Sequence, residues 1–340
     1  MLLLGPRSAQ VRRRDLLKLT GGMAVAWPIS THAQQRSAVR HIGVLLGLSK
    51  GADDPGTGEI MRPLQAAMGE MGWTEDKNLR LSILYGGGDR TKIDAAADQL
   101  VSLAPELIYV TGLPPALALR KRTLAIPIVF SLVADPVGFG LVESLSRPGG
   151  NVTGFIVWDL SIGGKWMQLL REIAPNVDHV GIMYNPDTGP YAPAIINSAK
   201  AAAKDIAIVD YHTRSEGEVE AATVRLGGRQ NSGLIVIPEP FTNANRDKII
   251  AYCNRSKVPT LNPVFGAANR GALLSYNFAF DSTIRQSATY VDRVLRGESP
   301  QNLPVQTPTK YELSINLGVA KNLGLNVPSN LLALADRVVD

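Results

Sequence analysis

Residues 126–157 have the sequence IPIVFSLVADPVGFGLVESLSRPGGNVTGFIV. The apolar run 126–132 has the length of a buried strand, and the pair Asp135-Pro136 predicts the start of a helix that continues to Leu145. A Pro-Gly-Gly-Asn turn at 148–151 then precedes a second apolar run at 152–157. Strand, helix, turn and strand in this order predict two parallel strands joined by a helix that covers one face of the sheet.

The same alternation extends in both directions from this stretch. Further strands are predicted at 39–46, 79–85, 106–110, 177–184, 206–211, 234–237, 258–261 and 272–275. Helices are predicted at 59–71, 89–103, 114–122, 192–204, 216–226, 243–255 and 281–295. Strands that alternate with helices along the chain indicate the α/β class.

Two halves of the chain resemble each other. The segment HIGV at 41–44 matches HVGI at 179–182, and ELIYV at 106–110 matches GLIVI at 233–237. A repeat of such a long period predicts two similar lobes, not an array of short repeats. We expect lobe 1 to contain 39–156 plus about 279–303, and lobe 2 to contain 157–278 plus about 304–340. Each lobe is expected to be a doubly wound parallel sheet, with the ligand cleft between the lobes.

The loops at the carboxyl ends of the predicted strands are where open parallel sheets bind ligands. These loops hold small, amide, hydroxyl, tyrosine and carboxylate side chains, a mixture that suits a small polar, amino-acid-like solute. The candidate ligand-binding residues are Ser49, Tyr85, Thr111, Gly112, Asp135, Tyr184, Asn185, Glu239, Asn262 and Tyr276. The candidate hinge is the short link Val157, Trp158 and Asp159. The alternative is that these are ordinary turn residues, because turns favour Gly, Asn, Asp and Pro.

Two carboxylates in this set, Asp135 and Glu239, are candidates to bind the ammonium group of an α-amino acid. Backbone N–H groups near Ser49 or Thr111 would bind the carboxylate of such a ligand. Asp135 has an alternative role as a helix N-cap ahead of Pro136. If neither carboxylate binds a cation, a neutral or anionic solute becomes the better hypothesis.

The first 33 residues predict an export signal. Arginines at 12–14 precede a short apolar stretch at 19–29, and the small-x-small pattern Thr31-His32-Ala33 marks a cleavage site. The paired arginines resemble the twin-arginine export motif, with general secretion as the alternative. The protein is therefore expected in the periplasm, cleaved near Ala33. It is not expected to be a lipoprotein, because no cysteine lies near the cleavage site.

The same segment holds most of the net charge. It has five cationic residues and one acidic residue, hence +4 of the chain's +5, and leaves about +1 for the mature protein. A chain so close to neutrality has no general basic surface, and no nucleic-acid partner is expected.

Motifs for catalysis and cofactor binding are missing from the sequence. The spacings typical of dinucleotide, phosphate-loop, zinc and serine-hydrolase sites do not occur. The single cysteine, Cys253, excludes an intrachain disulfide and is expected to be a small buried apolar residue. We therefore expect no cofactor, no metal and no catalytic residue.

Several stretches are similar to the substrate-binding family of ABC transporters that includes tryptophan- and tyrosine-type uptake proteins. The most specific similarity is the block from DPVG at 135–138 to RPGGNVTG at 147–154. Supporting stretches are YNP at 184–186, GALLSY at 271–276, YVD at 290–292 and YEL at 311–313. The resemblance implies a two-lobed periplasmic-binding fold with three crossovers. We expect a monomer without enzymatic activity that delivers a small-molecule solute to an ABC permease in the inner membrane.

This chain departs from that family at one loop. Members often have an Asp-Asn pair and a nearby Thr after a strand of the second lobe, where this chain has Pro238-Glu239-Pro240. The departure weighs against an aromatic amino acid as the ligand.

Two other classes of protein use a similar frame. A periplasmic enzyme stays an alternative, because a pair of carboxylates or tyrosines escapes a motif search, and turnover of metabolites would distinguish it. A transcription regulator with a lac-repressor-like core is not supported, because the chain has an export signal and no helix-turn-helix segment before residue 39.

Overall fold

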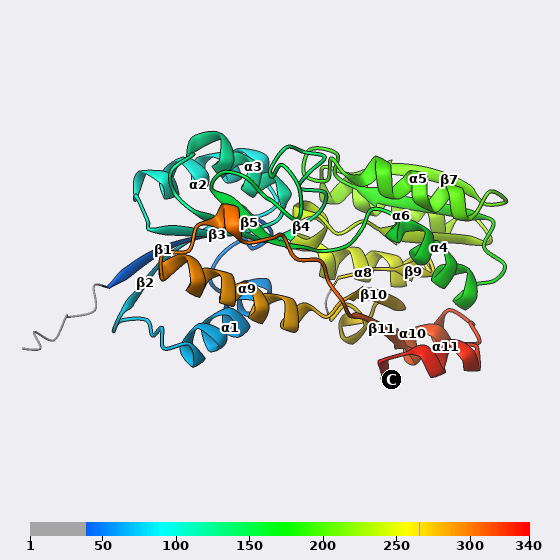
Figure 1. Cartoon of the computed structure of the whole chain (residues 1–340). Coiled ribbons are helices and arrows are strands. Elements are labelled where there is room, and N and C mark those ends of the chain that lie inside the picture. Colours follow the sequence, from blue (N-terminus) through cyan, green and yellow to red (C-terminus); the bar gives the residue numbers. More distant parts are fainter. Residues whose placement is uncertain (1–38, 265) are drawn as a thin grey trace, which may run out of the picture. The chain divides into compact units, whose positions relative to one another are not determined.

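The computed structural model describes residues 39–264 and 266–340. Residues Val39–Asp340 form one compact unit, whereas the predicted export signal and its cleavage site lie outside the described residues. Two sheets with helices packed on them make up this unit (Figure 1), which confirms the predicted α/β class. Among the helices of the described residues, none has the length and hydrophobicity needed to cross a bilayer.

The first sheet has five parallel strands in the order β2-β1-β3-β4-β5. These strands are β1 (Arg40–Leu46), β2 (Leu79–Tyr85), β3 (Leu107–Thr111), β4 (Ile128–Val133) and β5 (Val152–Ile156). The helices on this sheet are α1 (Pro55–Glu70), α2 (Arg90–Ser102), α3 (Leu113–Arg122) and α9 (Phe280–Leu295). Helix α9 lies beside α1 although about 200 residues separate them in the sequence (Figure 1).

The second sheet has seven strands in the order β12-β11-β10-β9-β8-β6-β7. They are β6 (His179–Tyr184), β7 (Ala207–His212), β8 (Ser232–Val236), β9 (Thr260–Leu261), β10 (Leu274–Phe278), β11 (Tyr311–Asn316) and β12 (Arg337–Val339). Its helices are α4 (Ile162–Ile173), α5 (Ala192–Ala202), α6 (Glu216–Gly227), α7 (Pro240–Ala244), α8 (Arg246–Arg255), α10 (Leu317–Asn322) and α11 (Ser329–Leu334), with a short 3-10 helix η1 (Ala268–Arg270). The strand pairs are parallel except β10 with β11.

The chain passes between the two sheets three times. The first passage follows β5 and ends where α4 begins to pack on β8 and β9. The second leads from Phe278 at the end of β10 to Phe280 at the start of α9. The third follows Gln306, which pairs with Phe155, and ends at Tyr311. The residue boundaries of the two lobes stay a prediction.

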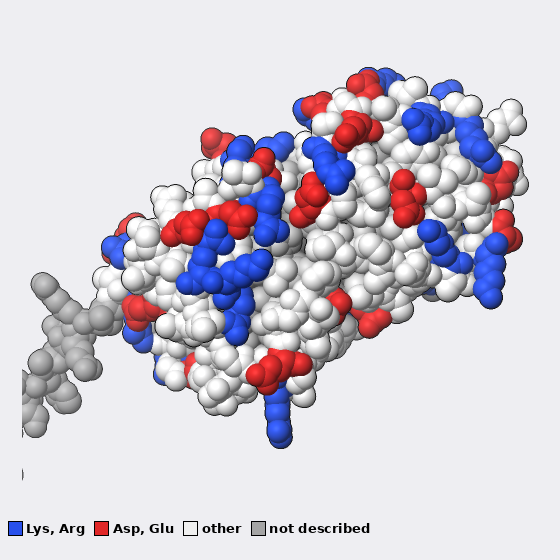
Figure 2. Space-filling model, turned by 90° about the horizontal axis from the view of Figure 1, so that it is seen from above, with Lys and Arg blue, Asp and Glu red and all other residues white. Residues whose placement is uncertain are grey.

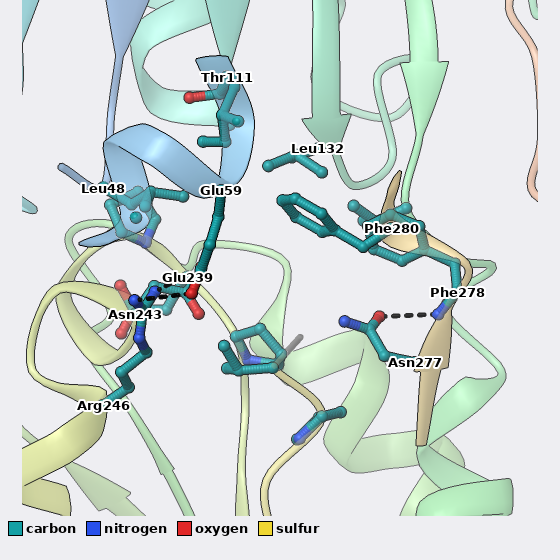
Figure 3. Close-up of a pocket in the computed structure, with 18 of the residues that line it drawn as sticks. Leu48, Glu59, Thr111, Leu132, Glu239, Asn243, Arg246, Asn277, Phe278 and Phe280 are labelled. Atoms are coloured by element: carbon teal, nitrogen blue, oxygen red, sulfur yellow. Dashed lines mark hydrogen bonds and ion pairs between the residues drawn. The ribbon is translucent and has the colours of Figure 1, made fainter. Parts of the chain in front are cut away.

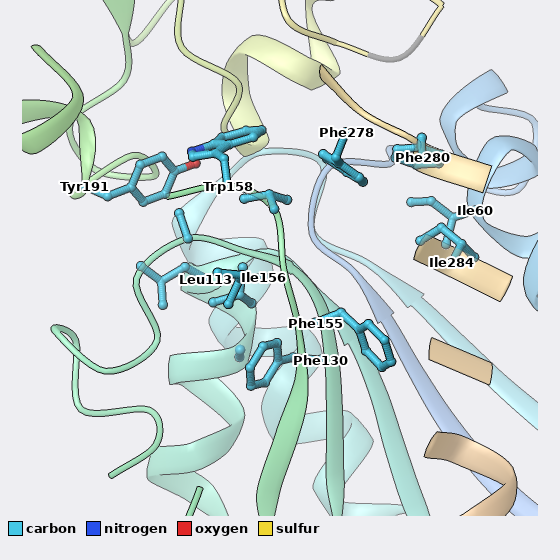
Figure 4. Packing of buried hydrophobic residues seen from close by; sticks show 14 of the residues in the cluster. Ile60, Leu113, Phe130, Phe155, Ile156, Trp158, Tyr191, Phe278, Phe280 and Ile284 are labelled. Atoms are coloured by element: carbon cyan, nitrogen blue, oxygen red, sulfur yellow. The ribbon is translucent and has the colours of Figure 1, made fainter. Parts of the chain in front are cut away.

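Buried apolar side chains continue from the first sheet to the passages between the sheets (Figure 4). Phe155 packs edge-on against Tyr290 of α9, with ring centroids 4.8 Å apart. Phe278 and Phe280 lie at the second passage, with ring centroids 5.8 Å apart. Each side chain of this size stabilises the fold by about 1.5–3 kcal/mol when it is buried.

The helix predicted after Asp135 does not form. Asp135 has a positive φ of 46°, and its side chain accepts a hydrogen bond from Gly138 N at 2.8 Å, so the segment is a series of turns. The same dipeptide does start a helix at Asp54-Pro55, where Asp54 accepts from Gly56 N and α1 begins four residues earlier than predicted. Asp54 itself has an extended backbone, with φ of −68° and ψ of 127°, whereas Asp135 has a positive φ.

One further predicted helix is divided in two, and one helix of the structure was not predicted. The helix predicted at 243–255 is divided into α7 and α8 at Asn245, whose φ of −113° and ψ of 12° are not helical. Helix α4 was not predicted, because its Ile162-Gly163-Gly164 start has low helix propensity. Gly163 is needed there, since a Cβ at this position would lie 2.1 Å from the Ile195 carbonyl oxygen of α5.

Basic and acidic side chains are interspersed on the face that Figure 2 shows. The basic end of α3 is an example, because Arg122 pairs with Asp94 at 3.2 Å and with Asp98 at 2.6 Å. Such neighbouring opposite charges agree with the small net charge calculated for residues after 33.

Candidate functional site

A cavity lies between the two sheets and takes its wall from both (Figure 3). It contains about 660 Å³ of space, including its open mouth. The wall consists of Leu48, Gly56, Glu59, Ile60, Thr111, Gly112, Leu132, Val157, Trp158, Tyr191, Pro238, Glu239, Pro240, Asn243, Arg246, Pro263, Val264, Asn277, Phe278 and Phe280. This is the place that parallel strands predict for a ligand, because their carboxyl ends meet there.

The first sheet contributes the ends of its central strands. Thr111 is the last residue of β3, and its buried hydroxyl oxygen accepts a hydrogen bond from Gly47 N at 3.2 Å. Gly112 follows with a φ of 88°, a backbone conformation that glycine adopts without strain, and so turns the chain into α3. At these two residues the wall is therefore made of backbone and a short side chain.

Glu239 lies in the loop after β8 and is 1% exposed. Its Oε1 accepts hydrogen bonds from the backbone N of Thr242 at 2.9 Å and of Asn185 at 3.3 Å. Its Oε2 accepts from Phe241 N at 2.7 Å and from the hydroxyl of Thr188. Glu239 thus caps α7 and connects it to the loop after β6.

Burial raises the pKa of Glu239 from 4.5 to about 7, although the hydrogen bonds from Thr188 and from the backbone favour its charged form. Because the folded protein binds this proton more tightly than the unfolded chain, the carboxyl group contributes stability that is complete below pH 4.5. That stability is lost as the pH rises through about 7.

We expect this loss of stability to appear when the parent is compared with Glu239→Gln, because the glutamine side chain neither binds nor releases a proton in this pH range. From pH 4.5 to pH 7.5, the free energy of unfolding of the parent should fall relative to the variant by up to about 3 kcal/mol. Urea unfolding of both proteins across this pH range measures the difference in unfolding free energy. The contributions of titrating groups that the two proteins share cancel in this difference. A difference that does not change with pH would contradict the raised pKa.

A second polar group joins the two sheets at the cavity wall. Glu59 of α1 forms an ion pair with Arg246 of α8, with Oε2 and Nη1 3.3 Å apart (Figure 3). Glu59 also pairs with Arg270 of η1, which in turn contacts Asp247 at 3.3 Å. The side chains of Arg246 and Glu59 are only 7% and 16% exposed. Arg246 lines the cavity and Arg270 does not, so Arg246 is the cation of this group that a ligand can contact.

The opposite side of the cavity is mostly apolar, with the polar side chain of Asn277 beside Phe278 (Figure 3). Leu132, Phe278 and Phe280 face the polar group across the cavity in Figure 3. Trp158 adds an indole ring whose centroid lies 6.3 Å from that of Phe278 and 5.5 Å from that of Trp166. In the described part of the chain, the buried Trp158 Nε1 has no hydrogen-bond partner. The cavity therefore combines a polar wall with an aromatic one.

The structure brings together part of the residues that the sequence singled out. Thr111, Gly112 and Glu239 line the cavity, and so do Val157 and Trp158 of the candidate hinge. The other candidates lie outside the cavity wall: Ser49, Tyr85, Asp135, Tyr184, Asn185, Asn262, Tyr276 and Asp159.

Most of these other candidates have partners within the chain. The Tyr184 hydroxyl lies 2.8 Å from His212 Nε2, and Asn185 Oδ1 accepts from Asp187 N. The ring of Tyr276 stacks on Tyr311 at 5.5 Å between centroids. Asp135 Oδ1 accepts from Gly138 N in the turn described above, and the role predicted for its charge in the cleft stays a prediction.

The remaining four candidates also lie outside the cavity wall. Asp159 accepts a hydrogen bond from Ser161 N just before α4, and Tyr85 ends β2, where burial raises the pKa of its hydroxyl. Ser49 and Asn262 are fully buried, and within residues 39–264 and 266–340 the Ser49 hydroxyl and the Asn262 amide have no hydrogen-bond partner.

Glu59, Arg246 and the aromatic residues near β10 were not predicted from the sequence. One signal for Arg246 was available: it occupies the same helical stripe as Ile249, Ile250 and Cys253, where a buried apolar residue is expected. A charged residue in such a stripe indicates a buried partner or a ligand. Cys253 is buried as predicted, and burial raises the pKa of its thiol to about 11. Among the described residues, no group of three or more His, Cys, Asp or Glu could hold a metal ion.

The chain is similar to known proteins in sequence. Residues 46–339 match the model of the family described as ABC transporter substrate binding protein. A tyrosine-binding protein of Clostridioides difficile is 26% identical over 282 residues, which cover 82% of this chain and 81% of that protein.

Two solved structures are similar over almost the whole described unit. A conserved domain protein from Vibrio cholerae has a TM-score of 0.80 and 29% identity, covering 88% of this chain and 99% of that chain. An ABC domain from Streptococcus pneumoniae in complex with L-Trp also has a TM-score of 0.80, with 23% identity, covering 89% of this chain and 100% of that chain. At that identity the second likeness is one of fold.

Proposed function

Because this chain belongs to the family of ABC transporter substrate binding proteins, which its residues 46–339 match, we propose that it is the exported receptor of an importer for an amino-acid-like solute. The observation that carries this proposal is the cavity between the two sheets, with Arg246 on one side and Trp158 and Phe278 on the other. A small molecule with a carboxylate at one end and an apolar group at the other fits these two walls. The family is one of binding proteins and not of enzymes.

The aromatic wall supports a solute with an aromatic or branched side chain. The relative from Clostridioides difficile is a tyrosine-binding protein, and the structure from Streptococcus pneumoniae holds L-Trp. The loop Pro238-Glu239-Pro240 weighed against an aromatic amino acid, but the rings of Trp158 and Phe278 supply the contact area that an aromatic side chain needs.

A thermal-shift screen tests the proposed class of ligand. The protein is unfolded and refolded first, so that no solute is carried over, and is then mixed with amino acids, other carboxylates, sugars and polyols. We expect the Tm to rise only with solutes that combine a carboxylate and an apolar group, because binding to the folded state alone stabilises it. A rise with sugars or polyols and with no carboxylate would contradict the proposal.

The proposed location is the periplasm, where the protein would act as a monomer and deliver its solute to a permease in the inner membrane. The family and the sequence pattern of the first 33 residues support this location. The segment Val157, Trp158 and Asp159 joins the two sheets, which supports its proposed role as one of the hinges.

Replacing Arg13 and Arg14 together by lysine is expected to leave uncleaved precursor in the cytoplasm, because twin-arginine export depends on the arginine pair. The parent should begin at Gln34 or within a residue or two of it. Mass spectrometry of periplasmic and cytoplasmic fractions measures both results. Equal cleavage of parent and variant would indicate general secretion, and an intact Met1 in the periplasm would rule out the signal.

A further inference from the structure

Most side-chain acceptors on the polar wall of the cavity are already bonded within the chain; among the described residues, the side-chain oxygen of Asn243 is an exception. Glu239 accepts hydrogen bonds from three backbone N–H groups and one hydroxyl. Glu59 is shared by the guanidinium groups of Arg246 and Arg270. Elsewhere in the wall, Thr111 Oγ1 accepts from Gly47 N and Asn277 Oδ1 accepts from Phe278 N. These bonds leave little capacity for a ligand that donates hydrogen bonds.

Donors, in contrast, are available at the same cavity. Trp158 Nε1 carries a hydrogen that can only be donated, and within the described residues nothing accepts it although the indole is 4% exposed. Arg246 uses Nη1 and Nη2 toward Glu59 and retains further N–H groups. A buried donor without a partner is costly, so the solute that fits best is one that brings acceptors.

The loop that holds Glu239 explains why this carboxylate is not available to a cation. Pro238 and Pro240 flank it, and Pro240 starts α7 without an N–H group of its own. The Pro238 carbonyl oxygen is bonded too, because it accepts from the Tyr191 hydroxyl at 2.6 Å. The carboxylate therefore caps the N–H groups of Phe241 and Thr242.

We infer that the cavity selects the carboxylate of its solute and does not require an ammonium group, so that its ligands include aromatic or branched carboxylic acids without an α-amino group. This inference rests on the proposed function and narrows it. An ammonium ion would compete with Arg246 and Arg270 for Glu59, or with the four donors for Glu239, and any donor that it displaced would be left unpaired in a buried site. A carboxylate displaces nothing, because it can accept hydrogen bonds from N–H groups of Arg246 that Glu59 does not use, or from Trp158 Nε1.

Three probes that share a phenyl ring and a short chain test this inference: L-phenylalanine, 3-phenylpropanoate and phenethylamine. Calorimetry on refolded protein is expected to show that 3-phenylpropanoate binds at least as tightly as L-phenylalanine, and that phenethylamine does not bind. An affinity for L-phenylalanine more than tenfold above that for 3-phenylpropanoate would overturn the inference and leave the proposed function in place. If none of the probes binds, and 4-methylpentanoate and L-leucine do not bind either, the proposed class of ligand fails as well.

The indole N–H is tested with Trp158→Phe, which keeps a ring and removes the donor. We expect this variant to bind 3-phenylpropanoate about tenfold more weakly than the parent, as expected for a lost hydrogen bond to a charged group. Trp73→Phe is the matched control, since Trp73 donates to Asp292 at 2.7 Å outside this cavity, and its affinity should not change. Equal affinities of Trp158→Phe and the parent would overturn the assignment of the indole to the carboxylate.

Discussion

Glu239→Ala is expected to lower the free energy of unfolding by about 3–5 kcal/mol, the largest effect on stability that we predict for a polar residue of this protein. The substitution removes the acceptor of three backbone N–H groups and of the Thr188 hydroxyl at once. Glu239 is 1% exposed, so water cannot replace the lost hydrogen bonds without rearrangement of the loop. The start of α7 and the loop after β6 should loosen together.

Urea unfolding at pH 7.5, followed by tryptophan fluorescence, measures this effect. Glu218→Ala is the matched control, because Glu218 also accepts from two backbone N–H groups at the start of a helix, those of Arg214 and Ser215, but on the surface. Water replaces its hydrogen bonds, so we expect a loss of about 1 kcal/mol or less. A loss for Glu239→Ala no larger than that for Glu218→Ala would show that burial does not determine the effect.

Arg246→Met is expected to weaken binding of a carboxylate solute by about 30- to 1000-fold, which corresponds to about 2–4 kcal/mol. Methionine keeps much of the apolar stem of arginine and removes the cation from the cavity wall. Glu59 is not left unpaired, since Arg270 still contacts it. The fold should therefore be retained, and the loss should appear in affinity.

Arg270→Met is the matched control for this prediction. It removes the other partner of Glu59 but does not change the cavity wall. Calorimetry with a carboxylate identified in the screen should give an affinity within about threefold of the parent for Arg270→Met and a large loss for Arg246→Met. Equal losses of affinity in both variants would mean that binding depends on the ion pairs of Glu59 between the two sheets, and not on contact of Arg246 with the ligand.

Local patterns in the sequence were sufficient for most of the fold. The strand predicted at 79–85 has the same bounds as β2, and the helices predicted at 114–122 and 216–226 differ from α3 and α6 by one residue at one end. Apolar periodicity is a property of each segment by itself, so it can be recognised without its neighbours. The repeat of similar segments also indicated the two lobes.

Prediction failed where the backbone conformation depends on distant contacts. Leu132 and Asp135 both have positive φ values, of 58° and 46°, and no local propensity predicts such values for these residue types. They lie beside the register shift between β4 and β5, a feature of strand pairing. An Asp-Pro pair therefore starts a helix at Asp54 but not at Asp135.

The same distinction applies to the residues of the candidate site. The sequence by itself identified Thr111, Gly112 and Glu239, because parallel strands place the residues that follow them at one edge of the sheet. Only the tertiary structure decided that Glu59 and Arg246, 187 residues apart, form an ion pair across the two sheets. It also decided that Tyr184 and Tyr276 have partners elsewhere, while Trp158 lines the cavity with an unpaired N–H among the described residues. Charge and hydrogen-bonding capacity are available to a ligand only where the chain has not used them, and that depends on every segment that packs around the cavity.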